Sequence, residues 1–181
     1  SEALEEPAPA PTTEPTPATP ERADVYVNGA RLGEPDLREL DVRVERRPEP
    51  GKYWYDAKSG LWGLIGHGAS GLTAPRLRAS PLAQDAASGT TGVVVNGREL
   101  NGTELAALAS LLAWPSSELP NYAGRYALDD HAGLYGPANR YLGNLTALAA
   151  KSPAATSTRC VWLHLGSARG PLGRDINIDC D

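Results

Sequence analysis

The sequence contains no methionine, no phenylalanine and only two cysteines among its 181 residues. Because those cysteines form no CxxC pair, a zinc site has too few ligands at too wide a spacing, and we predict no metal and no cofactor. No apolar stretch approaches the roughly 18 residues that a membrane span needs. The net charge is −5, whereas a nucleic-acid surface would require a basic stripe. These absences predict no membrane span and no nucleic-acid partner.

The first 22 residues are rich in Ala, Glu, Thr and Pro. Such a segment buries too little apolar area to offset its ordering entropy, and its prolines favour an extended conformation. We therefore expect residues 1–22 to form an extended or disordered arm. Composition of this kind, on a chain without an initiator methionine, is typical of the spacer that follows a removed export signal in bacteria. The alternative is an arbitrary boundary in a cytosolic protein.

The two cysteines are Cys160 and Cys180, both near the end of the sequence. A disulfide between them would close a loop of about 20 residues and restrict the unfolded chain by roughly 3 kcal/mol. A catalytic thiol is the alternative, but it leaves the second cysteine unexplained. Disulfides persist in oxidising compartments, so the pair predicts a secreted, periplasmic or cell-surface protein.

Two blocks of sequence recur in the same order. Residues 25–40 (VYVNGARLGEPDLREL) match residues 93–108 (VVVNGRELNGTELAAL) at seven positions without a gap. Residues 51–63 (GKYWYDAKSGLWG) match residues 124–136 (GRYALDDHAGLYG) at six positions. Blocks that recur in order and at similar separation indicate an internal duplication.

Each repeated block predicts the same local structures. A run of β-branched residues ending in Asn-Gly is typical of a hairpin with a type I′ turn. A helix follows in each unit, and Pro115 is expected to end the second one. The later block predicts a second hairpin around a short Asp-to-Gly loop. The fold class predicted is therefore α+β, with two pseudo-repeated hairpin–helix–hairpin units and a C-terminal disulfide-closed hairpin.

The domain organisation follows from these units. We expect one globular domain after the arm, covering residues 23–181. Its parts are repeat unit one (25–63), a connector (64–92), repeat unit two (93–136) and a C-terminal segment (137–181). Apolar runs at 160–165 and 175–179 predict the strands of the final hairpin.

One hairpin concentrates aromatic side chains at Tyr53, Trp54, Tyr55 and Trp62. Alternation along a strand places Tyr53 and Tyr55 on one side, which we expect to face the core with Trp62, and Trp54 on the other. The second copy has an alanine where the first has Trp54, so this residue either is an exposed recognition aromatic or covers the linker or the other unit. Aromatic surface is what interfaces and sugar-binding platforms use, so these four residues are the predicted binding site.

Two further stretches, WYDAKSGLWG and DAASGTTGVVVNGREL, carry a resemblance to known sequences. They resemble an uncharacterised element of bacterial proteins, and they are similar to the stretch preceding the G-protein-like domain of plant extra-large G proteins. The resemblance covers roughly residues 51–136 and implies a common scaffold without an activity. The chain has no GxxxxGKS-type loop to bind phosphates, and the cysteine cluster of the plant region is missing, so no functional residue transfers.

Few residues suggest catalysis. His131 lies in the second hairpin turn, where a solvated side chain is expected. His164 lies within the apolar run VWLHLG, where it is expected to be a strand side chain. His67 lies in a Gly-rich loop, and a site formed with Ser70 or Asp85 is the enzymatic alternative.

The carboxylates suggest structural tasks. Asp56 and Asp129 occupy equivalent turn positions, which favours a structural role over an acid–base pair. Asp175, Asp179 and Asp181 carry the oxygen ligands of a hard cation, but without a glycine among them or a bidentate Glu they favour a solvated strand face.

The combined features favour a non-enzymatic, exported binding or assembly module of a bacterial envelope. We expect a protein or glycan partner, bound through the aromatic hairpin and the edge strands, and self-assembly through residues 1–22. The alternative is a small secreted hydrolase with its site near His67. A disulfide-closed protease-inhibitor-like protein is a third class, although no reactive loop stands out.

Overall fold

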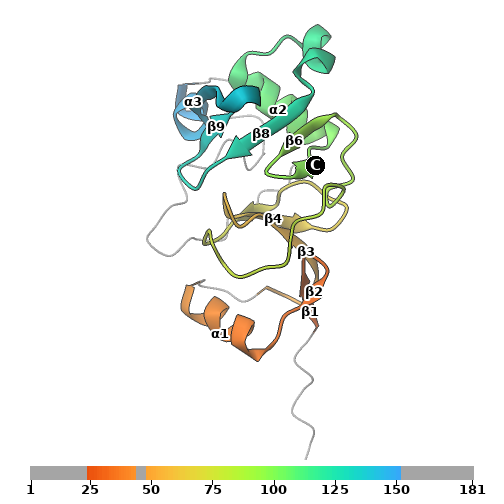
Figure 1. Cartoon of the computed structure of the whole chain (residues 1–181), viewed down its shortest axis with the longest axis vertical. Coiled ribbons are helices and arrows are strands. Elements are labelled where there is room, and N and C mark those ends of the chain that lie inside the picture. The colour runs from red at the N-terminus through yellow and green to blue at the C-terminus, as the bar shows by residue number, and fades with distance from the viewer. Residues whose placement is uncertain (1–23, 44–47, 152–181) are drawn as a thin grey trace, which may run out of the picture.

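The structure is a computed structural model, and it describes residues 24–43 and 48–151. These residues form a mixed α and β fold, as the sequence predicts. The helices are α1 (Glu34–Arg43), α2 (Gly102–Leu112) and α3 (Leu145–Lys151), with short 3₁₀ helices η1 (Ser116–Tyr122) and η2 (Pro137–Asn139). Figure 1 shows α1 at one end of the long axis, and α2 and α3 towards the other.

The strands form two sheets of five strands each. The first sheet has the order β2-β1-β3-β4-β5 and contains β1 (Val25–Val27), β2 (Ala30–Arg31), β3 (Gly51–Tyr55), β4 (Leu61–Leu64) and β5 (Gly71–Leu72). The second has the order β10-β9-β8-β6-β7 and contains β6 (Val93–Val95), β7 (Arg98–Glu99), β8 (Gly124–Leu128), β9 (Gly133–Tyr135) and β10 (Tyr141–Asn144). Both sheets therefore extend beyond the predicted units, since β5 and β10 lie in the predicted connector and C-terminal segment.

A parallel strand pair lies at the centre of each sheet. In the first sheet β1 pairs with β3, with Val25 opposite Gly51. In the second, β6 pairs with β8, with Val93 opposite Gly124. Each pair is connected through a hairpin return and a helix, the crossover that parallel neighbours require. The sequence predicted the hairpins and helices but not this pairing.

Two Asn-Gly turns begin the sheets. Asn28 and Gly29 have φ of 50° and 81°, and Asn96 and Gly97 have φ of 50° and 93°. Positive φ at both central residues is what a type I′ turn requires, so the predicted hairpins are confirmed at these positions.

The turn asparagines also extend the parallel pairing. The Asn28 side chain accepts from Tyr55 N at 2.8 Å and donates to Tyr55 O at 2.8 Å. The Asn96 side chain accepts from Leu128 N at 3.0 Å and donates to Leu128 O at 2.7 Å. Each amide thus continues the hydrogen-bond ladder one step past the end of its strand.

The second hairpins differ in register between the two sheets. Tyr55 of β3 lies opposite Trp62 of β4, whereas Leu128 of β8 lies opposite Leu134 of β9. A shift of one residue moves a side chain to the other face of a sheet. Aligned residues of the two blocks therefore do not all face the same way.

One buried cluster contains residues from both sheets and from α2. It includes Trp54, Leu61 and Leu72 of the first sheet together with Val93, Val95, Tyr126 and Leu134 of the second and Leu105 and Leu108 of α2. A smaller cluster lies on the other face of the first sheet and contains Tyr55 and Leu77, with Val27, Leu40 and Trp62 packed against it. The first sheet therefore has apolar contacts on both of its faces.

Some predictions concern residues outside the described ranges. The arm, the disulfide between Cys160 and Cys180, and the C-terminal hairpin all lie there, and within the described residues no disulfide is found. Among the helices that the structure describes, none has the length and apolar character that crossing a membrane requires.

Candidate functional site

The four predicted aromatic residues divide into a buried pair and a half-buried pair. Trp54 is 0% exposed and Tyr55 is 5% exposed. Tyr53 and Trp62 are half-buried, and their rings meet edge to face with centroids 5.8 Å apart. Only Tyr53 and Trp62 therefore keep surface that a partner can contact.

Tyr55 anchors the chain that follows the hairpin. Its hydroxyl donates to Ala74 O at 2.6 Å and accepts from Leu77 N at 3.1 Å. Burial raises the pKa of Tyr55 to about 12, although the hydrogen bond from Leu77 N acts in the opposite direction. A side chain so engaged supports the fold.

Trp54 packs against the second sheet instead of forming recognition surface. Its indole N–H donates to His67 O at 2.9 Å, and the Arg98 guanidinium lies 4.0 Å from its ring centroid. The close approach depends on Gly63, where a Cβ would lie 2.8 Å from the Trp54 ring. Of the two roles that the sequence left open for Trp54, covering the other unit is the one in the structure, and its buried ring offers a partner no surface.

Beneath Trp54 lies a buried ion pair that the sequence analysis did not identify. Arg98 donates to both carboxylate oxygens of Glu104, at 2.8 and 2.9 Å, and the two side chains are 2% and 0% exposed. Glu104 also accepts from Asn101 N at 3.2 Å and from Ala69 N at 2.9 Å. One carboxylate thus holds the start of α2, strand β7 and the loop after β4.

A sequence signal for this pair does exist. Asn101 accepts from Glu104 N at 2.9 Å, which completes a capping box at the start of α2. The pattern Asn-x-x-Glu before an apolar helix is a known signature of such a start. It indicates the cap, but it does not predict the contacts to Arg98 and Ala69.

The face of the first sheet that carries Tyr53 is only partly covered. Leu64, which lies opposite Tyr53 across the β3–β4 ladder, is 44% exposed. We call the surface formed by Tyr53, Trp62 and Leu64 the half-open face. It contains the two predicted binding residues that remain accessible.

Helix α1 explains why this face is half-open. None of the residues of α1 is buried, whereas α2, at the corresponding place in the strand order, buries six. The aligned partner of Tyr53 in the second sheet, Tyr126, is 7% exposed, and Trp114 packs against it with ring centroids 5.8 Å apart. A charged helix gives less cover than an apolar one.

His67 is exposed, and its backbone is held in place. Its N–H donates to Leu64 O at 3.0 Å, and its carbonyl accepts from the Trp54 indole. Among the described residues, the imidazole has no hydrogen bond or ion pair with Ser70 or Asp85. The site that the hydrolase alternative places near His67 therefore stays a prediction.

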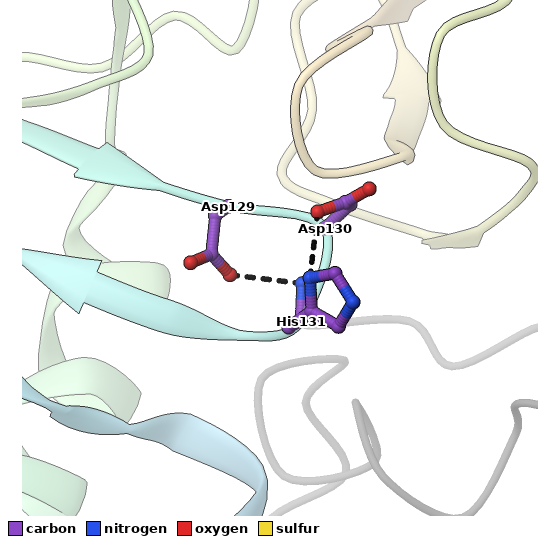
Figure 2. Close-up of side chains that lie close together, drawn as sticks. All are labelled: Asp129, Asp130 and His131. Carbon is purple, nitrogen blue, oxygen red and sulfur yellow. Dashed lines mark hydrogen bonds and ion pairs between the residues drawn. The ribbon is translucent and has the colours of Figure 1, made fainter.

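Asp129, Asp130 and His131 form the cluster drawn in Figure 2, and their potential ligand atoms lie within 4.8 Å of one another. Asp129 accepts from His131 N and Gly133 N, both at 2.8 Å. Asp130 pairs with Arg76 at 2.6 Å and with the His131 imidazole at 2.9 Å. The residue types are those of a metal site, but the contacts are those of an ordinary turn.

The predicted turn roles of the two aspartates are confirmed. Asp56 accepts from Lys58 N at 3.0 Å and from the Ser59 hydroxyl, and Asp129 likewise accepts from two backbone N–H groups of its own turn. The exposed position of His131 likewise agrees with the prediction of a turn residue. His164, Asp175, Asp179 and Asp181 lie outside the described residues.

Comparison with known proteins gives a limited set of similarities. No family model matches the chain, and no solved structure matches it. Among curated proteins, extra-large guanine nucleotide-binding protein 1 of Arabidopsis thaliana is 39% identical over 84 residues, which cover 45% of this chain and 10% of that protein. Extra-large guanine nucleotide-binding protein 2 of the same plant is 32% identical over 93 residues, which cover 50% of this chain and 10% of that protein.

These relatives correct the expected origin and location. Because the matched proteins come from a plant, the expectation of a bacterial, secreted or periplasmic envelope protein is wrong. It depended on the composition of residues 1–22, which is shared by linkers in many settings, and on a cysteine pair that lies outside the described residues. The expected similarity to plant extra-large G proteins is confirmed: the chain resembles, over about half of its own length, a segment that makes up a tenth of each relative.

Proposed function

We propose that this fold is a non-enzymatic module that binds another protein through the half-open face. The observation that carries the proposal is the incomplete cover on Tyr53, Trp62 and Leu64, the last of which is 44% exposed beside Tyr53. Interfaces are enriched in aromatic residues with adjoining apolar surface. A partner that packs on this face would bury surface that α1 leaves accessible.

The half-open face favours a protein over a glycan. Sugar platforms present open aromatic ring faces, whereas the Tyr53 and Trp62 rings meet edge to face at 5.8 Å and are half-buried. The exposed residue opposite Tyr53, at the end of β4, is the aliphatic Leu64. An apolar side chain of a protein partner is the better match for it.

The charged groups support a binding role more than a catalytic one. Arg98 and Glu104 pair with each other in the core, and Asp56 and Asp129 each accept backbone N–H groups of their own turns. Groups held in this way stabilise loops and strands.

We also infer that the two sheets descend from one duplicated unit. The support is the shared strand order, the shared parallel pairing of the first and third strands, and the two Asn-Gly turns with matching side-chain contacts. In this proposal, the second unit kept an apolar helix that packs on its sheet. The first unit has a charged helix that leaves a binding face open.

A capture experiment with matched variants tests the binding proposal. We immobilise the unchanged full chain and its variants Leu64→Asp and Val42→Asp. Mass spectrometry then quantifies the proteins that each of the three chains captures. Val42 is the control because it is also apolar and is 79% exposed on α1. We expect a partner whose recovery falls by about tenfold with Leu64→Asp, the loss expected for a buried interface contact, and is unchanged with Val42→Asp. Equal recoveries from all three chains would contradict the proposal.

The enzymatic alternative has a separate test. His67→Ala and the unchanged chain are assayed on ester, peptide and peptidoglycan substrates. We expect no turnover from either chain, since the imidazole has no hydrogen bond or ion pair, within residues 24–43 and 48–151, to a group that would activate a nucleophile. Turnover that disappears with His67→Ala would favour the hydrolase.

A further inference from the structure

The face of the first sheet opposite the half-open face carries a row of two cations around an aromatic ring. Tyr26 of β1 lies directly opposite Arg31 of β2 and Lys52 of β3. Directly opposed residues of neighbouring strands point to the same side of a sheet. Lys52 also precedes Trp54 by two residues, so the row continues the side that Trp54 occupies. We call Tyr26, Arg31 and Lys52 the cationic row.

The cationic row is accessible and incompletely neutralised. Arg31 and Lys52 are exposed and Tyr26 is half-buried. Arg31 pairs with Asp24 at 2.7 Å, with side chains 64% and 57% exposed. Within the part of the chain that the structure describes, the Lys52 ammonium has no ion pair. Ile65, whose N–H donates to Lys52 O at 3.0 Å, adds an apolar side chain that is 44% exposed.

The sequence that precedes β1 has the complementary chemistry. Residues 1–22 contain five glutamates, one arginine and six prolines, which gives a net charge of −4. Proline-rich segments bind to aromatic side chains because they lose little entropy on docking, and glutamates pair with exposed cations. The Asp24–Arg31 pair holds Asp24, two residues after this segment, beside the row, so the effective concentration of the tethered segment there is high.

We propose that residues 1–22 bind the cationic row of the same chain, with glutamates paired to Lys52 and Arg31 and prolines packed against Tyr26. In an extended conformation these residues span up to about 70 Å, which is ample for a return to the row. The half-open face has no part in this interaction. The test of this interaction is therefore independent of the test of the proposed function.

The chain has three lysines, Lys52, Lys58 and Lys151, and all three are exposed. This permits a sharp cross-linking test on the full chain. A carbodiimide activates a carboxylate, and a nearby lysine amine then displaces the urea by-product to form an amide that mass spectrometry locates. Lys58 and Lys151 are internal controls, because neither belongs to the row.

We expect amides between glutamates of residues 1–22 and Lys52 to exceed those to Lys58 and Lys151 by about tenfold at low salt. Their yield should be independent of protein concentration, and it should fall at 0.5 M salt because the attraction is screened. A yield spread evenly over the three lysines, or one that rises in proportion to concentration, would overturn the proposal.

Nearness along the chain could by itself favour Lys52, so a second variant separates tethering from binding. Tyr26→Ser and Arg31→Ser keep Lys52 and the whole of residues 1–22, and circular dichroism confirms that each variant is folded. We expect both to lower the Lys52 yield several-fold, while Arg78→Ser, an exposed arginine outside the row, leaves it unchanged. If the row variants cross-link as well as the unchanged chain, the segment is only tethered nearby and the proposal fails.

Discussion

Glu104 connects several parts of the molecule at one buried carboxylate. It pairs with Arg98 through two hydrogen bonds, accepts from the N–H groups of Asn101 and Ala69, and is 0% exposed. Buried ion pairs recover their desolvation cost only when every remaining polar atom also has a partner. Both carboxylate oxygens of Glu104 meet this condition, since each accepts from Arg98 and from a backbone N–H.

Glu104→Gln should therefore lower the free energy of unfolding by about 3–5 kcal/mol, because the neutral amide leaves the Arg98 charge buried without compensation. Urea denaturation measures the change. The double variant Arg98→Met with Glu104→Leu is the control and should lose less than Glu104→Gln, since no charge remains buried. A Glu104→Gln chain as stable as the unchanged one would contradict the assigned role.

Tyr55 makes stability depend on alkaline pH. Its pKa is raised by burial from 10.0 to about 12, so the folded state favours the neutral phenol. This contribution is complete below pH 10 and is lost as the pH rises from 10 towards 12, where the unfolded chain releases the proton first. We expect a loss of roughly 2 kcal/mol over that window, measured by urea denaturation at several pH values.

The Tyr55→Phe variant isolates this effect. It has no proton to lose at position 55, so its stability should fall less between pH 10 and 12 than that of the unchanged chain. Its stability at pH 8 should already be lower by about 1–3 kcal/mol, because Ala74 O and Leu77 N lose their partner. If the free energy of unfolding falls equally with pH in both chains, groups other than Tyr55 cause the loss of stability at alkaline pH.

At the scale of elements, the Asn-Gly turns act both as hairpin turns and as extensions of the parallel ladder. Asn96 has φ of 50° and, besides its bonds to Leu128, donates to Asp56 at 2.6 Å. Asn28 makes the same ladder bonds but donates to Ser80 O at 2.8 Å. The turn of the second sheet thus contacts the hairpin of the first.

Two substitutions separate the two roles of Asn96. Asn96→Gly keeps the positive φ without strain and loses only the side-chain bonds, which should cost about 1–3 kcal/mol. Asn96→Ala also places a Cβ in the left-handed region and should cost about 1 kcal/mol more. Thermal denaturation measures both, and equal losses would show that the turn conformation contributes nothing.

The elements that the sequence predicted share a physical basis. Asn-Gly after valines predicts a hairpin, and the apolar spacing from Leu105 to Leu112 predicts a helix, because both depend on residues within a few positions. The parallel pairing of β1 with β3 was missed, since it joins residues about 26 positions apart and no local pattern reports it. The register shift between the hairpins was missed for the same reason.

At the scale of the whole molecule, the buried cluster joins the two sheets. Trp54 is 0% exposed within it, and its ring covers Arg98 of the other sheet. Two further contacts are the Asn96–Asp56 hydrogen bond between the units, at 2.6 Å, and the Arg76–Asp130 pair between the connector and the second unit, also at 2.6 Å. A core shared in this way favours joint unfolding of the two sheets.

Trp54→Ala should accordingly destabilise both sheets. Removing a buried tryptophan costs about 3–5 kcal/mol, and native-state hydrogen exchange should show faster exchange in β3 and in β6 alike. Val42→Ala is the control, since Val42 is 79% exposed and its loss should change stability by at most about 0.5 kcal/mol. Faster exchange confined to the first sheet would indicate that the two sheets unfold separately.

The aromatic site shows how much of the candidate surface was predictable. The alternation of side chains along the strand correctly placed Trp54 on the other face of the sheet from Tyr53 and Tyr55. It does not say which of the two faces contacts the second unit. That depends on Gly63, which lets the indole lie close, and on the Arg98–Glu104 pair beneath it. The sequence named four aromatic residues, and packing left two of them accessible.

The sequence alone determined the turns, the helices, the mixed α and β class and the similarity to plant extra-large G proteins, because each depends on neighbouring residues or on direct comparison of letters. Only the tertiary structure decided the parallel pairing, the burial of Trp54 and Glu104, and which faces of the first sheet remain accessible. These depend on side chains from distant parts of the chain competing for the same core, and a local pattern carries no information on that competition.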